Sequence, residues 1–141
     1  MANKIDNVID AIETALAALV TAGTLKTVKR EVLLPFAEHN PPVLGLAASA
    51  LHRETTTWIA EVLITMVTHK GSTSADQTCT ELVATIDAAI MAVNGEGKGG
   101  IIDQPRWEFW YDVHKSGEPL QHVGAVASVR IRCQDPLAIA E

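Results

Sequence analysis

Cysteines and aromatic residues are scarce in this sequence. Its 141 residues include two cysteines, Cys79 and Cys133, which are far apart and form no CxxC pair. Aromatic residues make up 4% of the chain. The number and spacing of the cysteines predict two free, buried thiols in a reducing compartment, with a disulfide as the alternative, and they exclude a cysteine-rich zinc site.

Long hydrophobic runs are missing too. No segment reaches the ~18–20 uninterrupted apolar residues that a membrane-spanning helix needs. In the first ten residues, MANKIDNVID, acidic side chains interrupt the apolar ones, unlike a secretory signal. The sequence therefore predicts a protein that stays in the cytoplasm of the cell that makes it and has no membrane partner.

Catalytic and ligand-binding motifs are also missing. The run GEGKGG at 95–100 lacks the GxxxxGK[ST] spacing of a phosphate loop and follows a predicted helix instead of a strand. The five histidines form no HxxxH or HExxH pair, GxSxG is missing, and the carboxylates are scattered. We therefore predict no enzymatic activity, no metal and no cofactor. The alternative is an unrecognised ligand-binding or catalytic site near His114, His122 and Trp110.

What the sequence does contain is the composition of one globular domain. Hydrophobic residues make up 48% and charged residues 20%, which predicts a single domain spanning residues 1–141. The formal net charge is −6, from 11 Lys and Arg against 17 Asp and Glu. Nucleic-acid phosphates attract basic surfaces, so we expect no nucleic-acid recognition.

Two segments have the three- and four-residue apolar spacing of amphipathic helices. The first covers residues 3–22 and the second covers residues 73–93. Gly23 and the pair Asn94-Gly95 follow these segments and predict where the helices end. The apolar stripe of the first helix is Ile5, Val8, Ile9, Ile12, Leu16, Leu19 and Val20, and that of the second is Cys79, Leu82, Val83, Ile86, Ala89, Ile90 and Val93.

Other segments have the two-residue alternation of strands. Residues 58–67 are apolar on both sides, which predicts a central strand. In a later strand, Trp107, Phe109 and Tyr111 share one side and are expected to face the core. The predicted strands cover a short piece within 24–30 and residues 43–51, 58–67, 106–114 and 122–134.

The segments between these elements are polar, proline-rich or glycine-rich. We predict loops at 32–40, 52–57 and 95–104, the last of them flexible, and a loosely held tail at 135–141. Strands paired through turns predict an α+β fold, with a mainly antiparallel twisted sheet of four to five strands and two helices packed on one face.

The order of these segments resembles that of the tail terminator, or tail-completion, proteins of long-tailed bacteriophages and prophages. The resemblance spans residues 3–136, although GEGKGG and residues 53–57 have no counterpart in the family pattern. The segments that carry it are IDNVIDAIETALAAL, HNPPVLGLAASA, WIAEVLITMVTH, STSADQTCTELVATIDAAIMAV and AVASVRIRCQDP.

The resemblance implies a structural protein of the virion. Proteins of this family form a ring, commonly a hexamer, that caps the tail tube, stops its growth and presents a surface to the head–tail connector. The implied partners are further copies of the chain, the tail tube protein and the connector protein. The implied location is the host cytoplasm during assembly and then the virion tail. A connector or another minor tail subunit is the alternative within the same class.

Five residues are candidates for contacts with other subunits or with the tube. Arg53 and Lys98 lie in the predicted loops 51–57 and 95–104, and such loops supply patches for ring contacts. Trp110 lies on the polar side of its strand beside Arg106, where a large aromatic favours an interface. Trp58 begins the predicted central strand and fits either the core or an interface.

Overall fold

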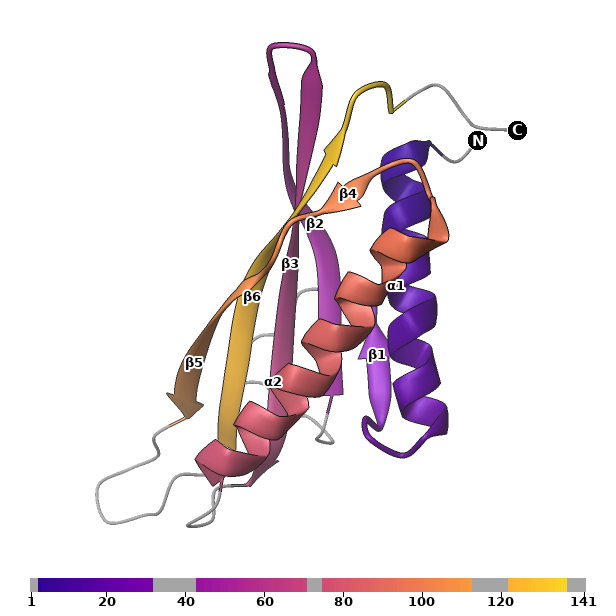
Figure 1. Cartoon of the computed structure of the whole chain (residues 1–141). Coiled ribbons are helices and arrows are strands. Elements are labelled where there is room, and N and C mark those ends of the chain that lie inside the picture. The colour runs from indigo at the N-terminus through magenta and orange to yellow at the C-terminus, as the bar shows by residue number, and fades with distance from the viewer. Residues whose placement is uncertain (1–2, 32–42, 71–74, 113–121, 137–141) are drawn as a thin grey trace.

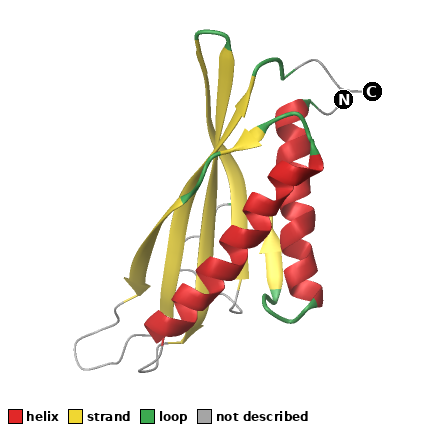
Figure 2. Ribbon diagram, in the orientation of Figure 1, coloured by secondary structure: helices red, strands yellow, loops and turns green. Residues whose placement is uncertain are grey.

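The computed structural model describes residues 3–31, 43–70, 75–112 and 122–136. Within these ranges the side chains at 68–70, 75–78, 110–112 and 122–123 are not described. Two helices lie on one face of a curled sheet (Figures 1 and 2). The elements are α1 Lys4–Thr21, β1 Thr27–Lys29, β2 Val43–Glu54, β3 Thr57–Lys70, α2 Ala75–Ala92, the 3-10 helix η1 Val93–Glu96, β4 Ile101–Ile102, β5 Arg106–Asp112 and β6 His122–Cys133.

The six-stranded sheet has the order β1-β2-β3-β6-β4, and β5 also pairs with β6. The pair β1–β2 is parallel, and the other four pairs are antiparallel. The predicted α+β class with both helices on one face is therefore confirmed. The sheet is mixed, with one short parallel edge strand, and it has one strand more than predicted because β4 lies in a predicted loop.

Helix α1 begins and ends where the sequence predicts. The side chain of Asn3 caps its start, since the Asn3 Oδ1 accepts a hydrogen bond of 2.8 Å from the backbone N–H of Asp6. Gly23 follows with a φ of 85°, which glycine adopts without steric cost. The predicted stripe is buried from Ile5 to Leu16, and Leu19 and Val20 pack at its margin.

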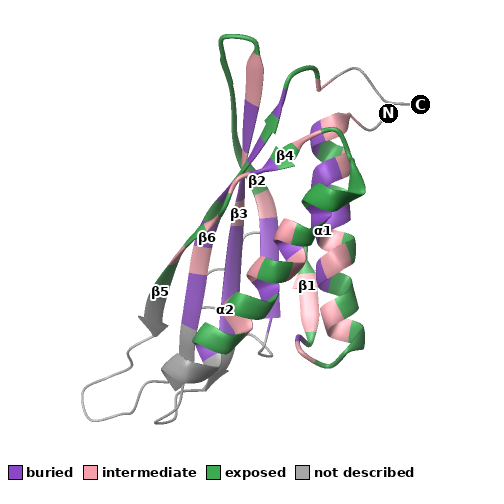
Figure 3. Ribbon diagram, in the orientation of Figure 1, coloured by how far each residue is buried: buried purple, intermediate pink, exposed green. Residues whose placement is uncertain are grey.

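The core lies between the helices and the sheet (Figure 3). The helix-facing side chains of β3 are Ala60, Val62, Ile64 and Met66, and all four are buried. Val67 on the opposite face is also buried and forms a separate small cluster with Val43. Strand β3 is thus central, between β2 and β6, and covered on both faces near this end, as its doubly apolar sequence predicts.

The hairpin loop predicted at 52–57 joins the expected two strands, but it is shorter than predicted. Strands β2 and β3 continue through it and meet at a two-residue turn, Thr55-Thr56. The segment reads as a loop because it is polar, but a hairpin that projects beyond the helices has solvent on both faces. Polar and β-branched side chains are compatible with strands in that setting.

The loop predicted at 95–104 is wrong in part. Residues up to Glu96 continue α2 as the 3-10 helix η1, and Ile101–Ile102 forms β4, whose buried Ile102 packs in the core. The Asn94 side chain bonds both backbone groups of Ile102, accepting from its N–H at 2.7 Å and donating to its C=O at 2.9 Å. Pairing of Ile101 and Ile102 with the distant strand β6 makes this segment a strand, and local composition does not reveal that partner.

Two other predictions concern segments that are wholly or partly undescribed. The loop predicted at 32–40 lies outside the described residues. The first part of the predicted tail is held, because the C=O of Pro136 accepts a 2.8 Å hydrogen bond from the backbone N–H of Lys4. Residues 137–141 lie outside the description.

Candidate interaction surface

The most prominent feature is a projecting hairpin, residues 48–60 of β2 and β3, which we call the arm (Figure 1). All residues from 48 to 56 are exposed. A β-bulge shifts the register between Ala48 and Ala50, and the hydroxyl of Ser49 within it donates to the C=O of Glu61 at 3.2 Å. The inserted residue reverses which side chains face the helices, so beyond it Leu51 shares the helix-side face with its partner Ala60.

Two of the five candidate residues meet on the arm. Arg53 and Trp58 are cross-strand partners, and the Arg53 guanidinium carbon lies 5.7 Å from the centroid of the Trp58 ring. This is cation–π geometry, which contributes about 0.5–1 kcal/mol at an exposed site. The contact holds an aromatic surface and a positive charge together at the projecting end of the molecule.

The turn of the arm is strained. Thr55 has a φ of 55°, and it is the one non-glycine residue with positive φ among those described. A β-branched side chain is disfavoured in this left-handed region. Thr55→Gly is therefore expected to raise the free energy of unfolding by about 0.5–1 kcal/mol, measured by urea denaturation. The matched change Thr56→Gly should lower it, and equal effects of the two changes would contradict the strain.

An apolar groove of about 370 Å³ separates the arm from the start of α1. Leu51 lies at its margin and is 58% exposed, the highest value among the large hydrophobic side chains described as exposed. The carboxylates of Asp6 and Asp135 also border the groove. Its apolar lining consists mainly of Ile5, Ile9, Ala48, Ala50, Leu51, Trp58 and Ala60.

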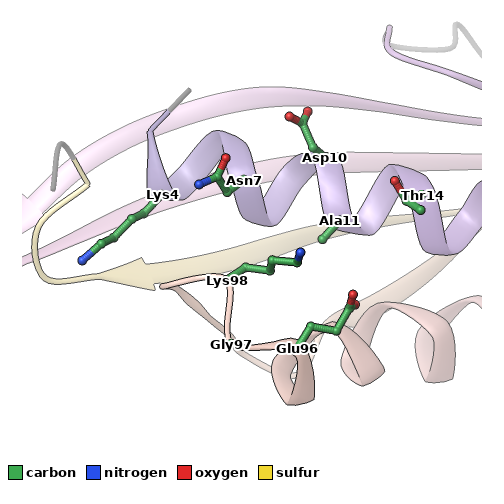
Figure 4. A pocket seen from close by; sticks show the side chains of 8 residues that line it. All are labelled: Lys4, Asn7, Asp10, Ala11, Thr14, Glu96, Gly97 and Lys98. Atoms are coloured by element: carbon green, nitrogen blue, oxygen red, sulfur yellow. The ribbon is translucent and has the colours of Figure 1, made fainter. Parts of the chain in front are cut away.

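Lys98 lies in a different groove, between α1 and η1 (Figure 4). This groove has a volume of about 440 Å³ and includes two lysines, Lys4 and Lys98, and two carboxylates, Asp10 and Glu96. Because positive and negative side chains both line this groove, it has no electrostatic potential of a single sign that would attract a charged ligand. The structure therefore separates Lys98 from Arg53 and Trp58.

The glycines beside Lys98 allow close packing against α1. A Cβ at Gly99, whose φ is 99°, would lie 2.9 Å from the Cγ and Cδ atoms of Lys4. A Cβ at Gly100 would lie 3.0 Å from methyl carbons of Val8 and Ile131. Close approach of the backbone to helix and sheet thus explains Gly99 and Gly100, whereas a Cβ at Gly95 or Gly97 would meet nothing within 4 Å.

Arg106 and Trp110 lie on β5, away from both grooves. They pair in register with Ser128 and Gly124 of β6, on the sheet face opposite the helices. Alternation along the strand places Trp107 on the helix side, where it packs against the core and its Nε1 donates to Asp87 Oδ1 at 3.0 Å. The side chain of Trp110 lies outside the description.

Phe109 corrects the prediction that it is buried in the core. It lies on the helix side of β5 with Trp107, yet it is 39% exposed. Alternation along a strand assigns a side chain to a face, but it does not reveal that the strand lies at the edge of the sheet. Leu51 and Phe109 are therefore surface residues that sequence reasoning missed. Both are now candidates for contact with a partner.

The remaining chemical groups give no reaction centre in the described part of the chain. Cys79 and Cys133 are buried and form no disulfide, as predicted. No group of three or more His, Cys, Asp or Glu side chains is placed for metal binding within residues that the structure describes. The alternative site at His114 and His122 lies outside the described side chains. No described helix is both long and apolar enough to cross a membrane.

An exposed ion cluster joins Arg30, which follows β1, to two carboxylates of α1. The Arg30 guanidinium donates to Asp10 Oδ1 at 3.0 Å and to Glu13 Oε2 at 2.9 Å. The hydrogen bonds to Asp10 and Glu13 raise the pKa of Arg30 above its ordinary value. All three side chains are largely exposed, so the cluster ties the chain after β1 to α1 without forming a buried charged site.

Comparison with models of known protein families finds no match, and comparison with curated proteins finds none that is significantly similar.

Proposed function

We propose that this protein is a tail terminator of a long-tailed bacteriophage or prophage. In this role it forms a ring, of six copies by the resemblance, that caps the tail tube and joins it to the head. Its partners are other copies of itself, the tail tube protein and the head–tail connector protein. It acts in the host cytoplasm during assembly and remains in the virion tail.

The arm is the observation that carries this proposal. It projects from the two-layer body with an exposed Leu51, an Arg53–Trp58 pair and an apolar groove at its base. Exposed apolar and aromatic surface of this kind marks contacts between proteins. The order of helix, strands, helix and strands on which the resemblance rests is kept in the described structure.

The test is deletion of the gene in a phage or inducible prophage that carries it, followed by electron microscopy of the particles. A terminator is expected to leave tails of uncontrolled, excessive length that do not join heads. Expression of the unaltered gene in trans should restore tails of uniform length. The control is the Glu96→Arg variant, which changes an exposed charge outside the arm. Its expression should also restore tails of uniform length.

Two other outcomes would contradict the terminator role. Tails of normal length that accumulate without heads would indicate a head–tail connector. Particles of normal morphology would exclude both, and thermal-shift screening of the purified protein against metals and metabolites would then test a ligand-binding role. A ligand that binds only the folded state raises the apparent stability in that assay.

A further inference from the structure

Along β2 and β5, two edges of the sheet carry no further strand within the residues that the structure describes. Strand β1 covers β2 only at Val43–Gly45. From residue 46 onward β2 pairs with β3 on one side, and no described strand pairs with it on the other. Strand β5 pairs with β6 alone, again within the described chain. Each edge therefore presents backbone N–H and C=O groups outside any ladder, and such edges are templates for pairing with another chain.

Strand direction allows these two edges to meet. The neighbouring pairs β2–β3, β3–β6 and β6–β5 are all antiparallel, so β5 runs opposite to β2. A second copy can lie beside the first with its helices on the same face and its strands in the same orientation. Its β5 then reaches the β2 edge of the first copy in the antiparallel direction. This contact joins two different patches, the kind of contact that builds rings and filaments.

Charge on the face opposite the helices selects one register. Beyond the bulge, β2 places His52 and Glu54 on this face, and β5 places Arg106 and Glu108 there. Antiparallel pairing with Glu54 opposite Arg106 also sets His52 opposite Glu108. A shift of two residues, the smallest that keeps the faces matched, places Glu54 against Glu108 or His52 against Arg106. Glu54 against Glu108 opposes like charges, which destabilises a strand pair. The other shift loses the Glu54–Arg106 pair, so the register with Glu54 opposite Arg106 is favoured.

The same register aligns two of the three large apolar side chains that are exposed in the described residues. On the helix side it places Phe109 of the second copy opposite Leu51 of the first. Leu51 borders the 370 Å³ groove at the base of the arm, which Ile5 and Ile9 line from α1. Phe109 and Leu51 are 39% and 58% exposed in the single chain, so both have apolar surface left to bury.

We propose that copies of this chain join head to tail through their sheets. Residues 50–54 of β2 in one copy pair antiparallel with residues 106–110 of β5 in the next. Glu54 lies opposite Arg106, His52 lies opposite Glu108, and Phe109 enters the groove beside Leu51. This contact would be the interface between neighbouring subunits of the proposed ring. That such contacts close into a ring rests on the proposed terminator function.

Charge reversal tests the contact with purified full-length protein. Glu54→Arg and Arg106→Glu are each expected to weaken self-association about tenfold per contact, measured by sedimentation velocity and native mass spectrometry, because an opposed pair of unlike charges becomes one of like charges. The double variant E54R/R106E should recover the oligomer. An equimolar mixture of the two single variants should recover it as well, since every edge in an alternating assembly again meets an opposite charge.

A second variant tests the apolar part of the interface. Phe109→Ser removes the side chain that enters the groove and should abolish the oligomer at concentrations where the unaltered protein assembles. Glu96→Arg is the matched control for a change of charge. Lys98→Glu tests whether the groove between α1 and η1 takes part in self-association. Neither change should alter the mass of the oligomer. Circular dichroism and thermal unfolding confirm that each variant folds, which is expected because all the changed side chains are exposed.

Three other results with the purified protein overturn the contact. An unaltered protein that stays monomeric excludes it. A response to Glu54→Arg without a response to Arg106→Glu indicates two-fold pairing of β2 with itself, and the reverse indicates pairing of β5 with itself. A ring that is insensitive to both reversals excludes this interface and leaves the terminator role standing. Normal tails in the deletion strain exclude that role but leave the contact untouched.

Discussion

Asn94→Ala is expected to lower the free energy of unfolding by about 2–3 kcal/mol. The Asn94 side chain supplies both hydrogen bonds on the outer side of Ile102, at 2.7 Å to its N–H and 2.9 Å to its C=O. The two hydrogen bonds are partly buried, and Ile102 is 2% exposed. Alanine leaves two backbone groups of β4 without partners, and desolvated groups of this kind are costly.

Urea denaturation followed by circular dichroism measures the effect. Asn7→Ala is the matched control, because Asn7 lies inside α1, four residues after the cap Asn3, where alanine is the better helix former. The control should change stability by less than about 0.5 kcal/mol or raise it slightly. An Asn94→Ala protein as stable as the control would show that β4 does not depend on this side chain.

The largest loss is expected for Ile64→Ala, at about 3–4 kcal/mol. Ile64 is completely buried on the helix side of the central strand β3, and its cross-strand partners are Leu46 and Ala127. Shortening it removes apolar contacts and leaves a cavity between sheet and helices. Strand pairs on both sides restrain β3, so the surroundings can close this cavity only in part.

Ile101→Ala is the control with the same chemical change. Ile101 is 56% exposed on β4, and its loss should cost less than about 1 kcal/mol by the same denaturation assay. In both variants the free energy of unfolding should fall with urea concentration at an unchanged slope, because the surface exposed on unfolding hardly changes. Equal losses for the two variants would contradict the assignment of β3 to the centre of the core.

Long periodic segments account for most of what could be predicted. The bounds of the first helix can be predicted to within one residue, because its apolar stripe and the stop at Gly23 are local signals. The central position of β3 followed from apolar side chains on both of its faces. These features depend on neighbours in sequence, so a single sequence carries them.

The candidate surface was predicted less well. Arg53 and Trp58 were assigned to a loop and a strand start, and the structure pairs them across a hairpin. Lys98 was grouped with them but lies in a separate groove, and Arg106 lies on another edge. Leu51 and Phe109 were not singled out, since nothing local marks a strand as an edge.

The sequence by itself determined the α+β class, the two helices and the assignment of most core positions, because hydrophobic periodicity fixes which side of an element avoids water. Only the tertiary structure decided that β1 is parallel to β2, that β4 exists and that the bulge at Ser49 turns Leu51 toward the helices. It also decided that no described strand pairs with the outer edges of β5 and of β2 beyond residue 45. Those features arise from hydrogen bonds between segments distant in the chain, and their partners cannot be read from the residues on either side.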